Sequence, residues 1–287
     1  MTWLSSIHTH THWCDGKSSV EALCQSAAEK GFVSLGVGGH APLPFESDCN
    51  MDLADIPAFR EEVFAARDKW QGNLEVYIGL EVDWIKGLCG PADGTLLRRD
   101  WDYLLGSVHY LAPAGQKPFA VDGPIAEFEE ALEKTYGGDI RALVLDYWDS
   151  VCQMIEVGGF DLVGHLDLIK KHNAGGRFFD PTAPWYREAA HRAVEALVKK
   201  RLICEVNTGG LARNRCTELY PSPELIDAVR DAGGTISIQS DAHAPEQLDG
   251  YYREGRDFLL ERGWKEHVVF SAGPVAGQGT WNLVALD

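Results

Sequence analysis

Residues 235–243 read TISIQSDAH, a short β-type run that ends in an acid and an imidazole. The same pattern recurs along the 287-residue chain, where β-type runs alternate with amphipathic helical stretches and polar side chains stand where the runs end. Strands that alternate with helices in this way are typically parallel and joined by crossover helices. The sequence therefore predicts an α/β fold with one barrel-like domain over residues 1–287.

Seven runs are predicted strands. They cover residues 4–10, 32–39, 74–84, 102–111, 160–169, 202–208 and 235–243, and a weaker eighth run covers 268–273. Helices are predicted at 19–30, 55–69, 125–136, 139–157, 184–200, 222–232 and 245–262, several of them opened by Ser, Asp or Pro in cap positions. The chain contains no internal repeat, low-complexity tract or linker that would divide it.

Composition limits the partners and the compartment. Lys and Arg total 26 against 43 Asp and Glu, a formal charge of -17 that repels polyanions, so nucleic acid is not expected as a partner. The sequence contains no apolar window of the roughly 18 residues that a membrane helix needs, so we expect no membrane association. Seven cysteines without a C-x-x-C pair, and no signal-like start, predict free thiols in a reducing cytoplasm.

Imidazole and carboxylate side chains stand at the ends of the predicted strands. In chain order they are His8, His10, His40, Glu81, His109, His165, Asp241 and His243. The carboxyl ends of barrel strands share one rim, and active sites are built there. A single histidine at such a place is more often a hydrogen-bonded structural residue. The whole set, however, has the ligand chemistry of zinc, iron or manganese, and a carboxylate can bridge two cations.

The stretch HTHTHWCDG at residues 8–16 is explained by strand geometry. Alternate residues of a strand point to the same face, so His8 and His10 can hold one cation from one side. His12 stands near the end of the predicted strand, where its direction is not predicted. This opening stretch is therefore expected to supply two neighbouring ligands.

HTHTHWCDG resembles the opening H-x-H-x-x-x-x-D-G motif of the polymerase and histidinol phosphatase (PHP) superfamily. The later blocks GLEVDW, GSVHYL, GHLDLIKK and SDAHAPEQLDG follow in the family's order, and the resemblance runs from about residue 8 to residue 250. The blocks HAPLPF, EVNTGGLAR and YPSPELI are similar to the histidinol-phosphatase branch in particular. In one departure, the family often has Asp before the histidine of the second strand, where this chain has Gly39.

The resemblance implies a distorted (β/α)7 barrel of the TIM type with two or three divalent ions, Zn, Fe or Mn. Carried over by position, the first ion would be held by His8, His10, Glu81 and Asp241. Glu81 would bridge to a second ion held by His109 and His165, and a third would be held by Asp15, His40 and His243. All nine positions carry a competent ligand, which favours a working enzyme.

The implied activity is metal-dependent hydrolysis of a phosphomonoester, most specifically of L-histidinol phosphate to histidinol and phosphate in histidine biosynthesis. The expected catalytic side chains are Glu81 between the ions and Asp241 or His243 as the proton donor to the leaving oxygen. Two alternatives stay open. The same site could act on a nucleotide or another small phosphate ester, or the chain could be a metal-binding regulatory module without turnover.

Expectations for substrate contacts rest on the loops, and the expected partner is a small phosphorylated amino-alcohol. Arg213 and Lys171 could offset phosphate charge, or be solvated loop cations, and Glu46 is a candidate partner for the amine or imidazole of the substrate. Asp167 is expected either to orient a ligand imidazole or to cap a helix or form a salt bridge. The excursion at 112–138 is either a lid or a subunit contact, and the sequence does not define the oligomeric state.

Overall fold

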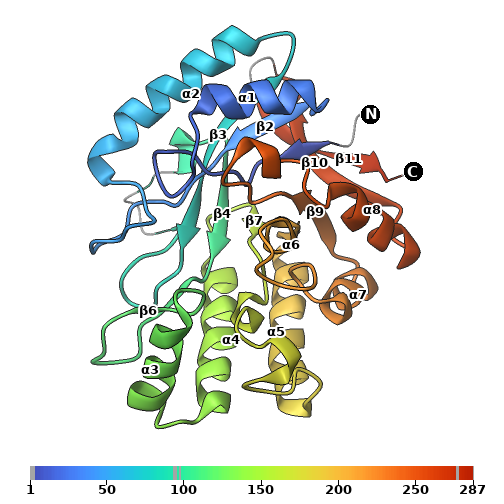
Figure 1. The fold of residues 1–287 in the computed structure, drawn as a ribbon. Coiled ribbons are helices and arrows are strands. Elements are labelled where there is room, and N and C mark those ends of the chain that lie inside the picture. The colour runs from blue at the N-terminus through green and yellow to red at the C-terminus, as the bar shows by residue number, and fades with distance from the viewer. Residues whose placement is uncertain (1–3, 93–95, 97, 276–277, 287) are drawn as a thin grey trace.

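The computed structural model describes residues 4–92, 96, 98–275 and 278–286. Seven strands form one sheet in the order β1-β2-β3-β4-β7-β8-β9, and every neighbouring pair is parallel. These strands are β1 (Ser5–Ser6), β2 (Ser34–Val37), β3 (Glu75–Asp83), β4 (Tyr103–Ser107), β7 (Leu162–Val163), β8 (Ile203–Asn207) and β9 (Thr235–Gln239). The first and last strands approach each other at a parallel bridge between Thr9 and Ala242, where the His10 amide donates to the Ala242 carbonyl at 2.8 Å. The nearly closed barrel confirms the predicted fold class (Figure 1).

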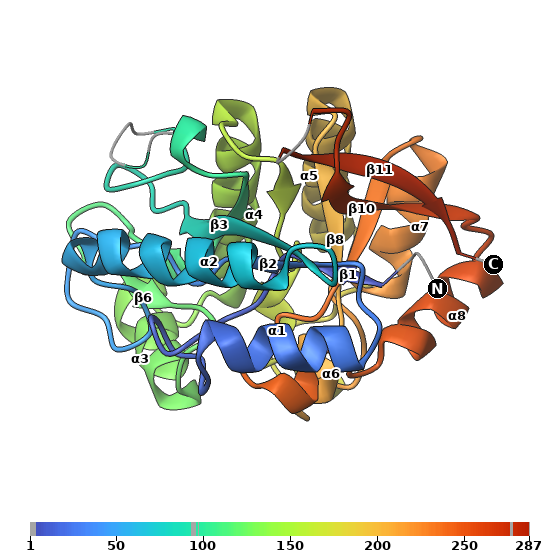
Figure 2. The same cartoon turned by 90° about the horizontal axis from the view of Figure 1, so that it is seen from above.

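Helices lie around the outside of the barrel (Figure 2). They are α1 (Val20–Glu29), α2 (Ile56–Trp70), α3 (Ile125–Tyr136), α4 (Ile140–Val157), α5 (Pro184–Lys200), α6 (Gly209–Ala212), α7 (Pro223–Asp231) and α8 (Tyr252–Glu261). Their starts follow from cap chemistry, since the side chains of Ser19 and Asp139 accept from backbone amides in the first turns of α1 and α4. Among the described residues, no helix is long and apolar enough to cross a membrane.

Several strands are shorter than predicted because side-chain oxygens replace the backbone ladder near the carboxyl rim. The run 4–10 forms a regular strand only at Ser5–Ser6, since the amides of Ile7 and His8 both donate to Gln239 Oε1, at 2.6 and 3.3 Å. Of the run 160–169, only Leu162–Val163 forms a strand, β7. Two residues beyond it, the His165 amide donates to a side-chain carboxylate and not to a backbone carbonyl of a neighbouring strand. The expected strands are therefore correct in place but not in length.

Two other predicted elements each correspond to two separate elements in the structure. The run 102–111 ends its barrel strand at Ser107, and β5 (Tyr110–Leu111) pairs antiparallel with β6 (Phe119–Ala120) outside the barrel sheet. The predicted helix 245–262 becomes a short turn, η5 (Pro245–Gln247), and then α8. The helix cannot run through this region because Tyr251, immediately before α8, has a left-handed backbone with a φ of 59°.

A hairpin of β10 (Glu266–Ala272) and β11 (Gly279–Ala285) covers the amino end of the barrel and lies beside β1, although these segments are far apart in the chain (Figure 1). The predicted run 268–273 belongs to this hairpin and not to the barrel sheet. Apolar side chains fill the space between hairpin and barrel. They are Ile7, Tyr77, Tyr103, Leu105, Leu162, Ile203, Val268 and Phe270. The amino end is therefore packed shut, which leaves the carboxyl end for a site.

Candidate metal centre

The nine predicted ligand residues meet at the carboxyl end of the barrel. They fall into four overlapping groups, in each of which one atom per residue lies within 4.8 Å of the others. The groups are His10, Asp15, His40 and His243; His8, Glu81 and His165; His8, His10 and Asp241; and His40, Glu81 and His109. Residues that are up to 235 positions apart in the sequence thus share one small volume, as the parallel strand ends require.

The innermost part of the cluster joins the first and last strands to β3. His8 Nε2 lies 3.1 Å from Glu81 Oε2, and His10 Nε2 lies 3.2 Å from Asp241 Oδ1. Ligand atoms at about 2.0–2.1 Å from one tetrahedral ion are about 3.3 Å apart. The spacing of these four atoms therefore fits a shared divalent cation.

Glu81 is the central carboxylate, and its two oxygens face different imidazoles. Oε1 lies 3.0 Å from His165 Nε2 and 3.5 Å from His109 Nε2. Oε2 faces His8 and also lies 3.1 Å from His40 Nδ1. A carboxylate placed in this way can bridge two cations and offset their mutual repulsion.

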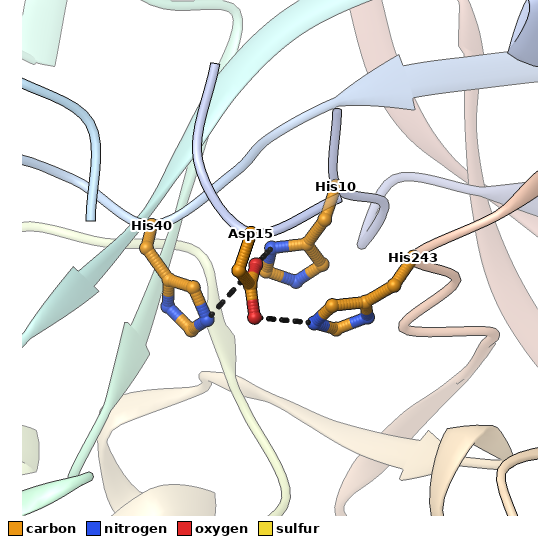
Figure 3. Close-up of side chains that lie close together, drawn as sticks. All are labelled: His10, Asp15, His40 and His243. Atoms are coloured by element: carbon orange, nitrogen blue, oxygen red, sulfur yellow. Dashed lines mark hydrogen bonds and ion pairs between the residues drawn. The ribbon is translucent and has the colours of Figure 1, made fainter. Parts of the chain in front are cut away.

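The outer part of the cluster surrounds Asp15. Figure 3 shows its carboxylate among three imidazoles, with His243 Nε2 at 3.0 Å, His10 Nδ1 at 3.4 Å and His40 Nε2 at 3.8 Å. The grouping differs from the implied ligand sets because His10 and His40 each turn one ring nitrogen toward Asp15 and the other toward the inner carboxylates. These two imidazoles therefore connect the inner and outer parts of the cluster.

Unsatisfied buried atoms show that divalent cations fit this cluster. His8 Nε2, His10 Nε2, Asp15 Oδ1 and Glu81 Oε2 are buried and make no hydrogen bond. Leaving a buried polar atom without a partner costs about 1–3 kcal/mol, and more for a charged group. All four atoms point into the cluster, and all are nitrogen or oxygen donors that suit divalent metals. Ions in the inner and outer parts of the cluster would satisfy them.

The electrostatics keep the carboxylates ionised. Burial by itself raises the pKa of Glu81, but His8, His109 and His40 outweigh it and hold that pKa well below its usual value. Burial lowers the pKa of His40 to about 4, and His10 and His109 act in the same direction. Burial also lowers the pKa of His109, but the negative charges of Asp83 and Glu81 outweigh it and raise that pKa to about 10. In the ion-free protein, therefore, protons on some imidazoles balance the carboxylates, and metal binding must displace them.

Two further carboxylates orient the ligand imidazoles, and the sequence analysis missed both roles. Glu205 Oε1 lies 2.5 Å from His8 Nδ1, and its Oε2 accepts from the His165 amide. Asp83 Oδ1 lies 2.9 Å from His109 Nδ1. Metal-bound imidazoles commonly need such a partner on the second ring nitrogen. The signal was an acidic residue inside an otherwise apolar strand, in LICEVNT and in GLEVDW.

Asp167 supports the fold and not a ligand imidazole. Its Oδ2 accepts from the Ser222 amide at 2.9 Å and lies 3.2 Å from Lys170 Nζ. Ser222 is the residue before α7, so this carboxylate ties the start of that helix to the loop after β7. Of the expected alternatives, the structure contains the salt bridge, with Lys170, and the Asp167 side chain makes no capping hydrogen bond to a helix in the described residues.

The cluster forms the floor of a cavity of about 390 Å³. Arg213 and Lys171 both line it, whereas Glu46 is exposed and does not. Arg213 places Nη2 at 2.7 Å from Asp241 Oδ2, and its Nη1 donates to the Asp241 carbonyl. Lys171 Nζ lies 3.0 Å from Asp122 Oδ2. The two basic side chains expected to contact the substrate, Arg213 and Lys171, thus lie beside the cluster, and each is paired with a carboxylate.

The departure at Gly39 has a steric explanation. A Cβ added there would lie 2.5 Å from Cys14 Sγ, which is closer than such contacts are found. The Cys14 thiol in turn lies 3.5 Å from His10 Nδ1. Cys14 therefore fills the space beside His10 that a side chain at position 39 would need.

A parallel barrel with a cluster of imidazoles and carboxylates at its carboxyl end defines a class of metal-binding α/β barrel proteins. The chain belongs to the PHP domain family, whose model matches residues 6–209. A Deinococcus radiodurans protein with the name "Probable histidinol-phosphatase" is 33% identical over 253 residues, which cover 86% of this chain and 89% of that protein. These findings confirm the family resemblance.

Two crystal structures have the same fold. A Listeria monocytogenes structure matches with a TM-score of 0.73 at 22% identity, covering 86% of this chain and 98% of that one. The histidinol phosphate phosphatase of Lactococcus lactis, complexed with zinc, L-histidinol and phosphate, matches with a TM-score of 0.68 at 19% identity, covering 94% and 98%. At these identities the likeness is one of fold.

Proposed function

We propose that residues 1–287 form one PHP-type metallophosphoesterase domain that hydrolyses L-histidinol phosphate to histidinol and phosphate, in histidine biosynthesis. The observation that carries this proposal is the convergence of nine metal-competent side chains on the floor of a cavity that suits a small ester. The 33% identity to the Deinococcus radiodurans protein supports the substrate, as does the ligand set of the Lactococcus lactis structure.

The ligand roles are the ones that the family resemblance implies. His8, His10, Glu81 and Asp241 would hold a first ion, Glu81 with His109 and His165 a second, and Asp15 with His40 and His243 a third. The convergence of all nine side chains supports these roles, although the geometric groups divide them differently. Nitrogen and carboxylate donors of this kind accept zinc, iron or manganese. When bound, such ions supply Lewis acidity, which activates a water and neutralises charge on the phosphoryl oxygens.

The chain's own residues would bind and orient the ester. Arg213, held by Asp241 at the cavity wall, offers a planar donor group to phosphate oxygens, and Lys171 adds a second positive charge. In the reaction the water oxygen bonds to phosphorus, the ester P–O bond breaks, and the leaving alkoxide takes a proton. Asp241 or His243, which both line the cavity beside the cluster, would take the proton that the water loses and pass it to the alkoxide.

Release of inorganic phosphate tests this proposal. The metal-loaded protein is assayed with L-histidinol phosphate and with a panel of mononucleotides and sugar phosphates, with Glu81→Ala as the inactive control. We expect the highest kcat/KM for L-histidinol phosphate. If a nucleotide is the best substrate, the protein is a phosphoesterase for nucleotides and not for L-histidinol phosphate. If the metal-loaded protein releases phosphate from none of these esters, the alternative of a metal-binding module without turnover remains.

A further inference from the structure

Most charged side chains of the cavity that are not in the ligand groups are grouped by sign, and Lys171, which pairs with Asp122 on the acidic side, is the exception. Basic residues lie on the side of His243. The Lys17 amide donates to the His243 carbonyl at 2.8 Å, and Arg213 Nη1 lies 3.0 Å from His243 Nδ1. Arg215 follows two residues later in the chain and also lines the cavity. This side of the cavity therefore suits the phosphate.

Acidic residues lie on the opposite side of the cluster, next to His109. Asp83 contacts the His109 ring, and the Val121 amide donates to the His109 carbonyl at 2.8 Å, which brings Asp122 to the same wall. Both carboxylates line the cavity. The Asp83 side chain is only 1% exposed, and its Oδ2 makes no hydrogen bond. The wall thus carries negative charge that the protein leaves incompletely satisfied.

The backbone on both sides of Asp122 is anchored. Val121 is tied to His109, and the carbonyl of Gly123 accepts from the ring of His172, with Nε2 at 3.0 Å. Lys171 Nζ contacts the Asp122 carbonyl as well as Oδ2, so the same lysine orients both backbone and carboxylate. Within the described part of the chain, Oδ1 of Asp122 makes no hydrogen bond and stays available to another donor.

We propose that Asp122 recognises the ammonium group of the substrate and so determines the preference for amino-alcohol phosphates over phosphate esters without an amine. This inference rests on the proposed function. In such a substrate two carbon atoms separate the ammonium from the ester oxygen, so a phosphate on the metal cluster places the ammonium beside the cavity wall. A carboxylate held there can accept a charge-assisted hydrogen bond.

Asp122 replaces Glu46 in the role that the sequence analysis gave to an acidic residue. Glu46 is exposed and outside the cavity, whereas the side chain of Asp122 is only 25% exposed and faces the cluster. Lys171 pairs with Asp122 Oδ2 and His109 with Asp83 Oδ1, so each carboxylate keeps one oxygen that makes no hydrogen bond within the described residues. Oδ1 of Asp122 can therefore accept from a cationic group of the ligand.

The test compares Asp122→Asn with the unchanged protein on two substrates, L-histidinol phosphate and its analogue without the amino group. Loss of a charge-assisted hydrogen bond should lower kcat/KM for L-histidinol phosphate by about 10- to 100-fold. The value for the analogue should change by less than about 3-fold, since it has no ammonium to lose. The ratio of the two values is the readout. Equal changes for both substrates, or no change for either, would overturn the inference.

Two control variants separate recognition from a structural effect. Glu127→Gln removes the same charge from an exposed residue of the same segment, outside the cavity, and should leave the ratio unchanged. Lys171→Met removes the other partner of the ion pair and should change kcat/KM for both substrates by the same factor. If Lys171→Met instead lowers the ratio as Asp122→Asn does, Asp122 acts only by holding Lys171, and the inference is wrong.

A failure of the proposed function is distinguishable from a failure of this inference. If the unchanged protein releases phosphate from other esters but not from L-histidinol phosphate, the proposed substrate is wrong. The Asp122→Asn ratio is then measured on the best amine-bearing and amine-free esters of the panel. A selective loss for the amine-bearing ester supports the role of Asp122 even so, and a uniform effect rejects it.

Discussion

The two ends of the barrel both bury polar groups, but they satisfy them differently. At the amino end Tyr103 Oη donates to the Ile7 carbonyl at 2.6 Å, and Ser237 Oγ donates to the Val268 carbonyl of the hairpin at 2.6 Å. At the carboxyl end His10 and Glu81 bury ring and carboxylate atoms that make no hydrogen bond. The first arrangement stabilises the protein alone, whereas the second is complete only with bound cations.

This difference separates the residues that hold the fold from those that hold ions. Substitutions at the amino end should lower the free energy of unfolding and spare activity. Substitutions at the carboxyl end should abolish metal binding and activity while the barrel persists, because the strands are also held by their ladders and by the apolar core. The following predictions test that separation.

The largest effect is expected for Glu81→Ala. Removing the carboxylate that faces His8, His40, His109 and His165 eliminates the bridge between ions. We expect kcat to fall by at least about 10³-fold, since Lewis-acid assistance is worth several kcal/mol. Phosphate release measures the loss and circular dichroism measures the fold. A variant that unfolds would place Glu81 among the residues that hold the barrel together.

Glu205→Gln should have an intermediate effect. The carboxylate orients His8 without belonging to the ligand groups, and loss of such a partner costs about 10- to 100-fold in metal affinity or activity. Competition with a chelator measures the affinity. Gln keeps the size of the side chain, so unchanged affinity would show that the contact between Glu205 and His8 is only structural.

Tyr103→Phe should destabilise the protein without inactivating it. The ring still packs against Phe270, but the buried Ile7 carbonyl loses its hydroxyl donor. Such a loss costs about 1–3 kcal/mol. Urea unfolding measures the stability, and phosphate release at saturating metal is expected to stay within about 2-fold because no ligand is touched. A loss of activity as large as that of Glu81→Ala would break the separation of the two ends.

The smallest effect is a pH dependence of the melting temperature. The pKa of His109 is raised to about 10 in the ion-free fold, so its stabilising contribution is complete below the usual value of 6.5 and declines as pH rises toward 10. Metal ions need deprotonated ligands, so their affinity rises over the same range. The increase in melting temperature on adding Zn²⁺ should therefore be greater at pH 9 than at pH 6.5. The opposite trend would contradict the ligand role of His109.

The strand ends could be predicted because their chemistry is local. Every predicted ligand except Asp15 stands at or near the end of a β-type run, and parallel topology brings such ends together, as the cluster of His8, Glu81 and His165 confirms geometrically. Asp15 was assigned only through the family resemblance. The alternation of strands and helices likewise predicts a parallel barrel, whereas its seven-stranded form was implied by the family resemblance.

What could not be predicted depends on contacts between distant segments. Gln239 replaces the backbone ladder beside Ile7, which shortens β1, and the partner strand β11 of the hairpin gave no recognised signal. Gly79 is required because a Cβ there would lie 2.3 Å from the Tyr103 ring. Asp122 is similar, since only the folded chain shows that its segment packs on the loop after β7. The hydrophobic periodicity of a sequence carries no information about such contacts between distant segments.

The metal content of the purified chain tests most directly whether the carboxyl end is built around ions. After reconstitution with Zn²⁺ and removal of unbound metal, elemental analysis should find two or three ions per chain, and Glu81→Ala should hold at least one fewer. A chain that holds no ion and still releases phosphate, or a Glu81→Ala variant with the same metal content as the unchanged protein, would contradict it.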